Sequence, residues 1–317
     1  MNRRTFVKST AAATAALHIP FAGHSMAFAK KRKFKLGLSP GNLGVSLDQK
    51  GTLEAAIKYG YEAIIASPGE LQKWSDEEMT AFKKKMKKHK ISWGSAGLPV
   101  QFRQDEDTFK EGLSKLADAA KALQRAGASR MNTWIMPTHP DLSYAANMKQ
   151  HASRLGECGK ILADYGVSLG LEYVGPKTLM ARDRYPFIHT LGECMDLITA
   201  TGQDNVGIQL DAFHWYCGED TEEDLLSLDP NRIVTVDLND ARSDLSRDEQ
   251  IDGTRELVGT TGVVEISTFL NALVEIGYAG PVRSEPFNQP LRDMDDDKAL
   301  ALDIKCLKDV LKKSGLK

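Results

Sequence analysis

The sequence predicts an α/β protein of the (β/α)8 barrel class, in which eight parallel strands, each followed by a helix, close into a ring. Three observations predict this fold. From residue 34 onward, short apolar runs alternate with longer segments whose apolar residues recur at helical spacing. Several helical segments stop at a glycine just before the next apolar run. Eight such units in about 285 residues match a closed barrel with right-handed crossovers.

Each apolar run is expected to form one strand of the barrel. In chain order the runs are 34–40, 61–67, 91–99, 129–137, 167–175, 206–215, 232–240 and 281–287. Between them, helical spacing is clearest in 108–127, 151–166 and 267–280. The main competitor is an open doubly wound sheet, but no strand precedes a GxGxxG or GxxxxGK[ST] loop. No composition shift or Pro/Ser-rich linker interrupts the series, so residues 30–317 are interpreted as a single domain.

Residues 1–29 are interpreted as a twin-arginine export signal that precedes the barrel. They contain Arg3 and Arg4, a modest apolar run, and the string AFA at 27–29, which has the A-x-A form of a cleavage site. The apolar run is too short and weak to anchor the protein permanently in a bilayer. The alternative is a basic, alanine-rich tail. With a signal, the mature protein is expected in the periplasm or another exported compartment.

Composition and charge limit the classes of partner. The 317 residues are 42% hydrophobic and carry a formal net charge of −2, which suits a soluble globular protein with a substantial core. Residues 1–29 hold basic but no acidic side chains, so the remainder is more acidic still. No basic excess is left to attract nucleic acid or an acidic membrane, while a homo-oligomer stays open. The four cysteines are widely spaced, and we expect mostly buried free thiols.

Acidic side chains lie near the ends of four consecutive predicted strands: Glu172, Asp211, Asp237 and Glu285. Strand ends converge at the C-terminal face of a barrel, so these side chains should meet in one cavity. Carboxylates this close repel one another unless protons or a cation neutralise them. A divalent metal with hard oxygen ligands is the economical solution. Alternatively, some of these acids cap helix N-termini or pair with Arg232, Arg242 or Arg283.

A family resemblance is carried by the strings GLEYVGPKT, QLDAFHW, VDLND and QIDGTRELVGTTGVVEISTFLNALVEIGYAGPVRSEPF. With them the chain resembles the xylose isomerase-like TIM-barrel superfamily of sugar isomerases and epimerases. The resemblance covers nearly all of residues 30–317 and is strongest over 172–287. It implies a small-molecule sugar substrate and a metal-binding rim, which in this superfamily serves isomerases, epimerases, dehydratases and nucleases.

The resemblance also implies one divalent metal ion and its ligands. The family's glutamate after strand five falls on Glu172, its aspartate after strand six on Asp211, and its last glutamate on Glu285. The ligand on strand seven is commonly a histidine in a V-H-x-x-D string, and here that position is Asp237. A carboxylate there favours Mn²⁺, Mg²⁺, Ca²⁺ or Co²⁺ over Zn²⁺. Two other interpretations stay open. In one, Asp237 does not contact the metal, which is bound by three protein ligands and water; in the other, the metal site has been lost.

The chemistry implied by the resemblance is removal of a proton from the carbon next to a carbonyl, through an enediolate intermediate. Glu172 and Glu285 would serve as the acid/base pair, one removing and the other returning a proton. His214 and Arg255 match family positions that bind substrate oxygens. Their alternatives are a structural histidine between two aromatic neighbours and an ordinary loop cation.

Three functional hypotheses follow. The first is an exported, divalent-metal-dependent sugar isomerase or epimerase. The second is a lyase or dehydratase that acts on keto-sugars or oxidised glycosides with the same metal site. The third is a non-catalytic sugar-binding protein, which the departure at Asp237 makes credible. A nuclease is disfavoured because residues 30–317 lack the histidine-rich array of the related abasic-site endonucleases.

Several loop residues are expected near the pocket on weaker grounds. Asn42, Gln101 and His139 lie in loops after predicted strands and could line the cavity. Trp134 is expected to pack in the core. Residues 183–185 fall in the long loop after Glu172, where a lid could form.

Overall fold

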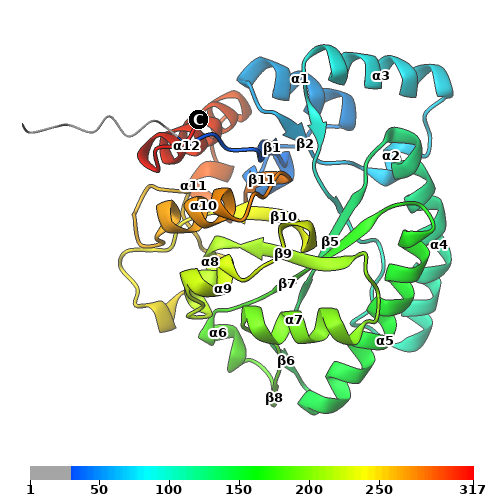
Figure 1. Ribbon diagram of the computed structural model, residues 1–317, viewed down its shortest axis with the longest axis vertical. Coiled ribbons are helices and arrows are strands. Elements are labelled where there is room, and N and C mark those ends of the chain that lie inside the picture. Colours follow the sequence, from blue (N-terminus) through cyan, green and yellow to red (C-terminus); the bar gives the residue numbers. More distant parts are fainter. Residues whose placement is uncertain (1–29) are drawn as a thin grey trace, which may run out of the picture.

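The computed structural model describes residues 30–317, and these residues form the predicted barrel (Figure 1). The predicted export signal, residues 1–29, lies outside the described residues. Every neighbouring pair in the nine-stranded sheet is parallel. In sheet order the strands are β3 (Ser92–Trp93), β2 (Ala63–Ile64), β1 (Lys35–Leu38), β11 (Pro281–Ser284), β10 (Ile233–Leu238), β9 (Val206–Asp211), β7 (Ser168–Tyr173), β5 (Arg130–Ile135) and β4 (Ala96–Gly97).

The two ends of this order, β3 and β4, are pieces of one predicted strand, 91–99. β3 pairs with β2, and β4 pairs with β5 on the other side. The chain bends between them at Gly94 and Ser95, where Gly94 N–H still donates to the carbonyl of Ile64 at 2.7 Å. The ring therefore closes through a single broken strand, and each of the eight predicted runs forms a barrel strand.

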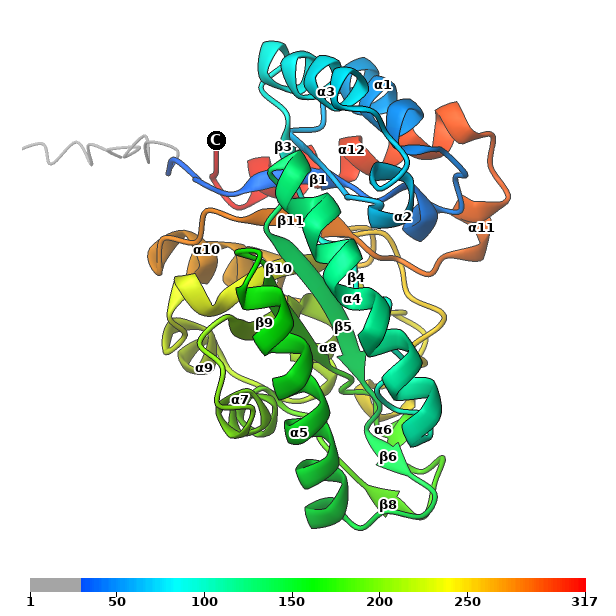
Figure 2. The same cartoon turned by 90° about the vertical axis from the view of Figure 1, so that its right-hand side faces the viewer.

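A second sheet lies outside the barrel. β6 (Thr138–His139) and β8 (Tyr185–Pro186) pair in antiparallel register, with His139 opposite Tyr185. Figure 2 shows this small ribbon beyond the end of β5, beside α6. It joins the loop after β5 to the loop after β7, so it stiffens one side of the face where the strands end.

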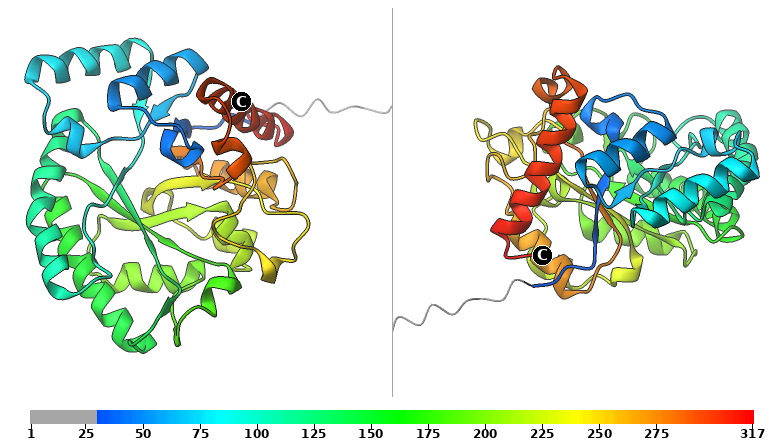
Figure 3. Two further views of the ribbon diagram at one scale, coloured as in Figure 1. Left: turned by 180° about the vertical axis from the view of Figure 1, so that it is seen from behind. Right: turned by 90° about the horizontal axis from the view of Figure 1, so that it is seen from above.

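Helices and short 3-10 turns connect the strands and cover the barrel (Figures 1 and 3). The helices are α1 (Gln49–Tyr59), α2 (Pro68–Leu71), α3 (Asp76–Lys88), α4 (Glu106–Ala126), α5 (Tyr144–Ala163), α6 (Lys177–Met180), α7 (Leu191–Ala200), α8 (Ala212–Cys217), α9 (Glu222–Leu226), α10 (Ile266–Glu275), α11 (Gln289–Arg292) and α12 (Asp296–Lys313). The 3-10 turns are η1 (Pro40–Leu43), η2 (Pro230–Arg232) and η3 (Arg247–Glu249).

The predicted helices are present, with two wrong boundaries: α10 ends at Glu275 rather than at 280, and α5 starts early. The segment 151–166 was expected to begin a helix, but α5 begins seven residues earlier, at Tyr144. Its first turns carry polar residues such as Asn147, which is buried. Because polar residues occupy the buried face there, the apolar period that marks a helix starts too late.

Local sequence signals explain where α4 starts and stops and where α3 starts. The side chain of Asp105 caps the start of α4 by accepting from Thr108 N–H, and Gly127 ends it with φ of 78°. α3 starts in a capping box between Ser75 and Glu78. Its first turn is acidic and its last turn is rich in lysine, which complements the helix dipole.

The strand β9 shows how the barrel separates its two faces. Val206 points outward, because a Cβ on Gly159 of α5 would lie 2.7 Å from its side chain. Gln209 and Asp211, on the opposite face, hydrogen-bond to side chains from neighbouring strands inside the barrel. At Gly207 a Cβ would lie 2.1 Å from the carbonyl of Arg232, so only glycine fits.

Two further sequence expectations bear on the surface and the core. All four cysteines are buried and free, as predicted. Within residues 30–317, no helix has the length and apolar content needed to cross a membrane.

Candidate metal and substrate site

The four acids predicted at the strand ends meet at the C-terminal face of the barrel. They come from four neighbouring strands, in the order β11, β10, β9, β7. The register places Asp237 directly beside Asp211, and Glu285 follows β11 with its N–H donated to the carbonyl of Leu238. Each of the four offers a carboxylate oxygen, and these atoms all lie within 4.8 Å of one another. Glu172 completes this acidic cluster from β7.

Asp211 is the most completely hydrogen-bonded acid of the cluster. Its Oδ1 accepts from the N–H groups of Phe213 and His214 at 2.6 and 3.2 Å, which caps the start of α8. Asn239 Nδ2 donates to both of its oxygens, and Arg255 Nη1 donates to Oδ2 at 2.9 Å. The helix-capping role considered for these acids from sequence therefore holds for Asp211.

Asp237 is paired with Arg283, which lies opposite it in the register of β10 and β11. Arg283 Nε donates to Oδ1 at 2.5 Å and Nη2 to Oδ2 at 3.1 Å. Gln209 Nε2 also donates to Oδ2, at 2.6 Å. Burial raises the pKa of Asp237, while Arg283 opposes that rise. Asp237, at the position where the family commonly has a histidine, is therefore paired with the guanidinium of Arg283.

Glu172 and Glu285 have weaker partners. Glu172 accepts one hydrogen bond, from Gln209 Nε2 at 2.8 Å. Glu285 accepts from Asn42 Nδ2 at 3.3 Å and from Arg255 Nη1 at 3.4 Å. Burial, followed by repulsion from the neighbouring acids, raises the pKa of Glu172 well above its usual range. Burial and Asp237 raise the pKa of Glu285 to about 8.

His214 and Arg255 lie beside the cluster, as the family resemblance implied. Arg255 is 2% exposed, and its Nη2 lies 3.1 Å from His214 Nε2. Nη2 also donates to Asp252 Oδ1 at 2.7 Å. Burial lowers the pKa of His214, so the imidazole is neutral. Burial alone would raise the pKa of Asp252, but Arg255 and His214 lower it. Arg255 therefore bridges two carboxylates of the cluster and Asp252.

A cavity of about 600 Å³ opens onto Glu172, Glu285, His214 and Arg255. Its remaining walls are largely apolar and include Trp134, Met136, Val174, Leu179, Ile251 and Phe287. The expectation that Trp134 packs in the core is wrong, because 40% of its surface is exposed. The guanidinium carbon of Arg103 lies 3.9 Å from its ring centre, so a cation rather than the core covers the indole.

Of the loop residues predicted near the pocket, some contact the site and others have only structural contacts. Asn42 reaches Glu285, as noted above. Gln101 and His139 are absent from the lining of the cavity, and His139 Nδ1 instead accepts from the N–H groups of the 141–142 turn. Residues 183–185 also lie outside the lining: Asp183 accepts from Thr138, and Tyr185 belongs to β8. In this loop the cavity is lined instead by Thr178, Leu179 and Arg182 of 178–182.

Asp240, which follows Asn239 after β10, has a structural role. It accepts hydrogen bonds from the N–H groups of Thr261, Gly262 and Val264. Its backbone also pairs with Glu256. Asp240 therefore fixes the loop that carries Arg255 and takes no part in the acidic cluster.

The cluster fits a divalent cation. Its four acids outnumber the two buried guanidinium groups that touch them, so protons or a cation must neutralise the other two carboxylates. The carboxylate oxygens are hard ligands of the kind that Mn²⁺, Mg²⁺ and Co²⁺ accept. Glu172 and Glu285 have the oxygen atoms least engaged by other donors, and a carboxylate oxygen each of Asp211 and Asp237 lies within 4.8 Å of theirs. These residues would hold the ion.

Comparison with known proteins identifies the family. Residues 53–310 match the family model described as xylose isomerase-like TIM barrel. Inosose isomerase of Bacillus velezensis is 26% identical over 241 residues, which cover 75% of this chain and 83% of the relative. Inosose isomerase of Bacillus subtilis is 24% identical over 66% of this chain and 72% of its own length.

Solved structures share the fold over most of the chain. A xylose isomerase domain protein from Alicyclobacillus acidocaldarius is 28% identical with a TM-score of 0.76, covering 90% of this chain and 99% of that one. The IOLI protein, solved with a zinc atom bound, is 22% identical with a TM-score of 0.73, covering 89% and 99%. D-psicose 3-epimerase with D-fructose is 16% identical with a TM-score of 0.65, covering 88% and 99%. The chain belongs to the xylose isomerase-like TIM-barrel family.

Proposed function

We propose that this protein is a divalent-metal-dependent isomerase or epimerase of a polyhydroxylated ketone, working by removal and return of a proton next to the carbonyl. The observation that carries the proposal is the contrast within the acidic cluster. Glu172 and Glu285 face one cavity with raised pKa values and few donors, whereas Asp211 and Asp237 are held by several. The names of the relatives, inosose isomerase and D-psicose 3-epimerase, support a ketose or cyclic ketone as the substrate class.

The two glutamates would act as the acid/base pair. A raised pKa brings a carboxyl group closer to the operating pH, where it can both take and give a proton. Glu172 on β7 and Glu285 after β11 flank the two aspartates, so a carbon seated between them is open to a glutamate from either side. When bound, a divalent cation supplies Lewis-acid polarisation of the carbonyl oxygen.

The remaining residues of the site would orient the substrate. Neutral His214 and the Arg255 guanidinium present hydrogen-bonding groups to substrate oxygens beside the acids. The apolar walls of the cavity would exclude water from the reacting carbon. Arg283 and Gln209 keep Asp237 in place without touching the cavity wall.

Proton exchange in D₂O tests the proposal. The protein, loaded in turn with Mn²⁺, Mg²⁺ and Co²⁺, is incubated with D-fructose, D-psicose and an inosose, and deuterium incorporation is followed by NMR. Exchange with formation of an epimer or isomer, lost in Glu172→Gln, is the expected outcome. Elimination of a group β to the ketone would establish a lyase instead. Tight sugar binding with no exchange in any case would establish a binding protein.

The identity of the metal has its own measurement. We propose Mn²⁺, Mg²⁺ or Co²⁺ rather than Zn²⁺, because the cluster is dominated by carboxylate oxygens. Metal analysis after purification, compared between wild type and Glu172→Gln, should show a bound ion that the variant loses. An ion retained by Glu172→Gln but lost by His214→Ala would overturn the proposed ligand set.

We also propose that residues 1–29 direct export through the twin-arginine route. The support is the Arg3 and Arg4 pair, the apolar run and the A-x-A string. Fractionation of cells that express the wild type and an Arg3→Lys/Arg4→Lys variant tests this. The wild type should accumulate in the periplasm and the variant in the cytoplasm, and equal distribution of the two would contradict it.

A further inference from the structure

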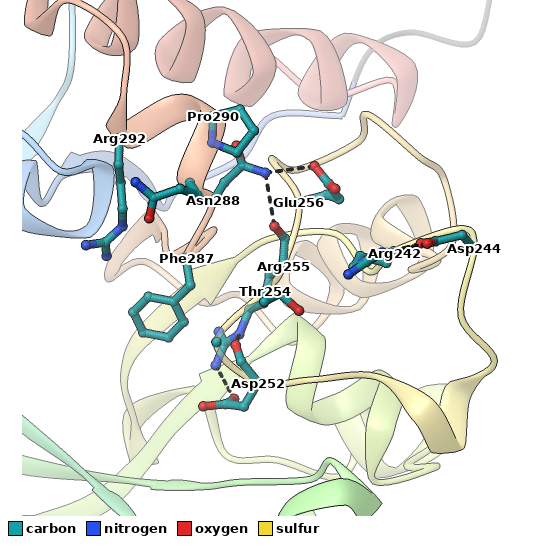
Figure 4. A pocket seen from close by; sticks show the side chains of 12 residues that line it. Arg242, Asp244, Asp252, Thr254, Arg255, Glu256, Phe287, Asn288, Pro290 and Arg292 are labelled. Atoms are coloured by element: carbon teal, nitrogen blue, oxygen red, sulfur yellow. Dashed lines mark hydrogen bonds and ion pairs between the residues drawn. The ribbon is translucent and has the colours of Figure 1, made fainter.

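A second cavity, of about 740 Å³, shares lining residues with the one that contains the glutamates. Figure 4 shows the side chains that line it. Its walls come from the loop after β10 and from α11 with the two residues that precede it. The lining residues are Arg242, Asp244, Asp252, Gly253, Thr254, Arg255, Glu256, Phe287, Asn288, Gln289, Pro290 and Arg292. None of the four clustered acids lies in its wall, so the proposed chemistry does not account for it.

The two cavities adjoin. Asp252, Gly253, Arg255 and Phe287 line both of them, so these residues form the boundary between the two spaces. The ring of Phe287 is held there by two cations: the guanidinium carbons of Arg255 and Arg292 lie 4.7 and 5.9 Å from its centre.

The backbone of Phe287 is strained at this boundary. Its φ is 41°, in the left-handed region that large side chains rarely adopt. Strain of this kind persists where the surrounding structure enforces it, and it gathers at ligand-binding sites. The strained residue lies between the two cavities and lines both.

The charges of the second cavity are balanced. Arg242 pairs with Asp244 at 2.5 Å, and Asn288 Nδ2 donates to Glu256 at 2.9 Å. Arg255 pairs with Asp252 at 2.7 Å. Arg292 has no acidic partner within residues 30–317, but three acids and three arginines line the space in total. Such a surface has no strong preference for an ion of either sign, and its paired polar groups around an aromatic ring suit a neutral polyol.

We propose that the second cavity binds a second sugar ring, so that the substrate is a keto-disaccharide or other glycoside of a ketose. The keto ring would occupy the cavity of Glu172 and Glu285, and the second ring would lie beyond Phe287 against Arg292. Each cavity is by itself within the range of ordinary small-ligand pockets, about 300–1,000 Å³. The inference rests on the proposed function, because it takes the first cavity as the place of the keto ring.

Calorimetric binding tests the proposal without turnover. D-fructose is compared with the keto-disaccharides lactulose, turanose and isomaltulose, with and without Mn²⁺. At least one disaccharide should bind the wild type about tenfold tighter than D-fructose. Arg292→Ala removes a side chain that lines the second cavity alone, although it also contacts the Phe287 ring, so it should remove that advantage and change the affinity for D-fructose far less.

A second variant places a larger side chain at the boundary between the two cavities. A Cβ at Gly253 would meet no atom within 4 Å, so the backbone there has room for a side chain, and Gly253→Leu places one at the junction. It should weaken disaccharide binding more than D-fructose binding. Gly192→Leu, at an exposed position where a Cβ also meets nothing, is the matched control and should change neither.

The outcomes separate this inference from the proposed function. Proton exchange on monosaccharides without any gain from a second ring would overturn the second-ring site alone. A disaccharide advantage lost in Arg292→Ala, in a protein that exchanges no proton, would keep the binding site and overturn the enzyme. Failure of all four sugars to bind would overturn the second-ring site.

Discussion

The two middle strands of the site, β9 and β10, surround their aspartates with hydrogen-bond donors, whereas the two flanking strands, β7 and β11, leave their glutamates with few. On β9 and β10, Asp211 and Asp237 each accept hydrogen bonds from a side-chain amide and a guanidinium, and Asp211 also accepts from two backbone N–H groups. On β7 and after β11, Glu172 and Glu285 receive one short hydrogen bond and two long ones between them. Burial is complete or nearly so for all but Glu285, so the number of donors rather than burial separates the pairs. The fold surrounds the aspartates with hydrogen-bond donors and leaves the glutamates with few, so the glutamates are the acids placed to exchange protons.

The largest effect should come from the glutamates. Glu172→Gln keeps the size of the side chain and the contact to Gln209 but removes the exchangeable proton. It should slow α-proton exchange by about 10²–10⁴-fold with little change in unfolding free energy. NMR exchange rates and urea unfolding measure the two quantities. A variant that unfolds easily and keeps its exchange rate per folded molecule would reverse the roles assigned to the pairs.

Removing the partner of a buried aspartate should change the free energy of unfolding. Arg283→Met leaves Asp237 as a buried charge without its guanidinium, which should lower the unfolding free energy by about 3–5 kcal/mol. Arg283→Met/Asp237→Leu should recover most of that loss, because no unpaired charge remains. Arg242→Met, which breaks the exposed pair with Asp244, is the control and should cost less than about 1 kcal/mol. Equal losses for the two arginine variants would contradict the distinction.

A buried acid away from the site tests the role of donors independently. Asp303 of α12 accepts a hydrogen bond from Tyr61 Oη at 2.7 Å, and burial raises its pKa to about 6 from 3.8. Because folding favours the protonated form, its contribution to stability is present below pH 4 and is lost as pH rises through 6. The wild type should lose about 3 kcal/mol over that window relative to Asp303→Asn. If the unfolding free energies of wild type and Asp303→Asn change with pH in the same way, the hydrogen bond from Tyr61 and the other surroundings of Asp303 stabilise its carboxylate as well as water does.

The smallest effect should come from the rim of the cavity. Trp134→Ala removes an exposed indole that lines the first cavity and that Arg103 covers. We expect KM for the ketose to rise a few-fold, with kcat and the unfolding free energy nearly unchanged, because surface positions contribute little to stability. Titration of initial rates with substrate measures both constants. A large fall in kcat would move Trp134 from the rim into the group that positions the reacting carbon.

Much of the fold was predictable from the sequence because strands and helices alternate with clear periods. All eight strands follow from apolar runs bounded by glycine and polar residues, and the convergence of strand ends then places the four acids together. The start of α5 was missed because its first buried residues are polar.

The partners of the acids were harder to predict. Gln209 lies two residues before Asp211 and Arg283 two before Glu285, so the period of a strand puts each on the same face as its acid. That period was a usable signal for Gln209. It could not show which acid Arg283 meets, since this depends on the register between β10 and β11. The prediction for Trp134 was wrong because the sequence pattern around an aromatic residue near a strand end does not distinguish a side chain that faces the core from one that faces a cavity.

The ends of the described chain meet at the base of the barrel. Lys30 forms a parallel bridge with Leu316, and Lys317 N–H donates to the carbonyl of Lys30 at 3.0 Å (Figure 3). The strands run from this base toward the acidic cluster, so a tag, tether or solid support attached at residue 30 or 317 would leave the cavities facing solution. The same proximity makes the barrel a candidate for circular permutation: a short linker would join the two ends, and new termini could be opened in an exposed loop far from the cavities.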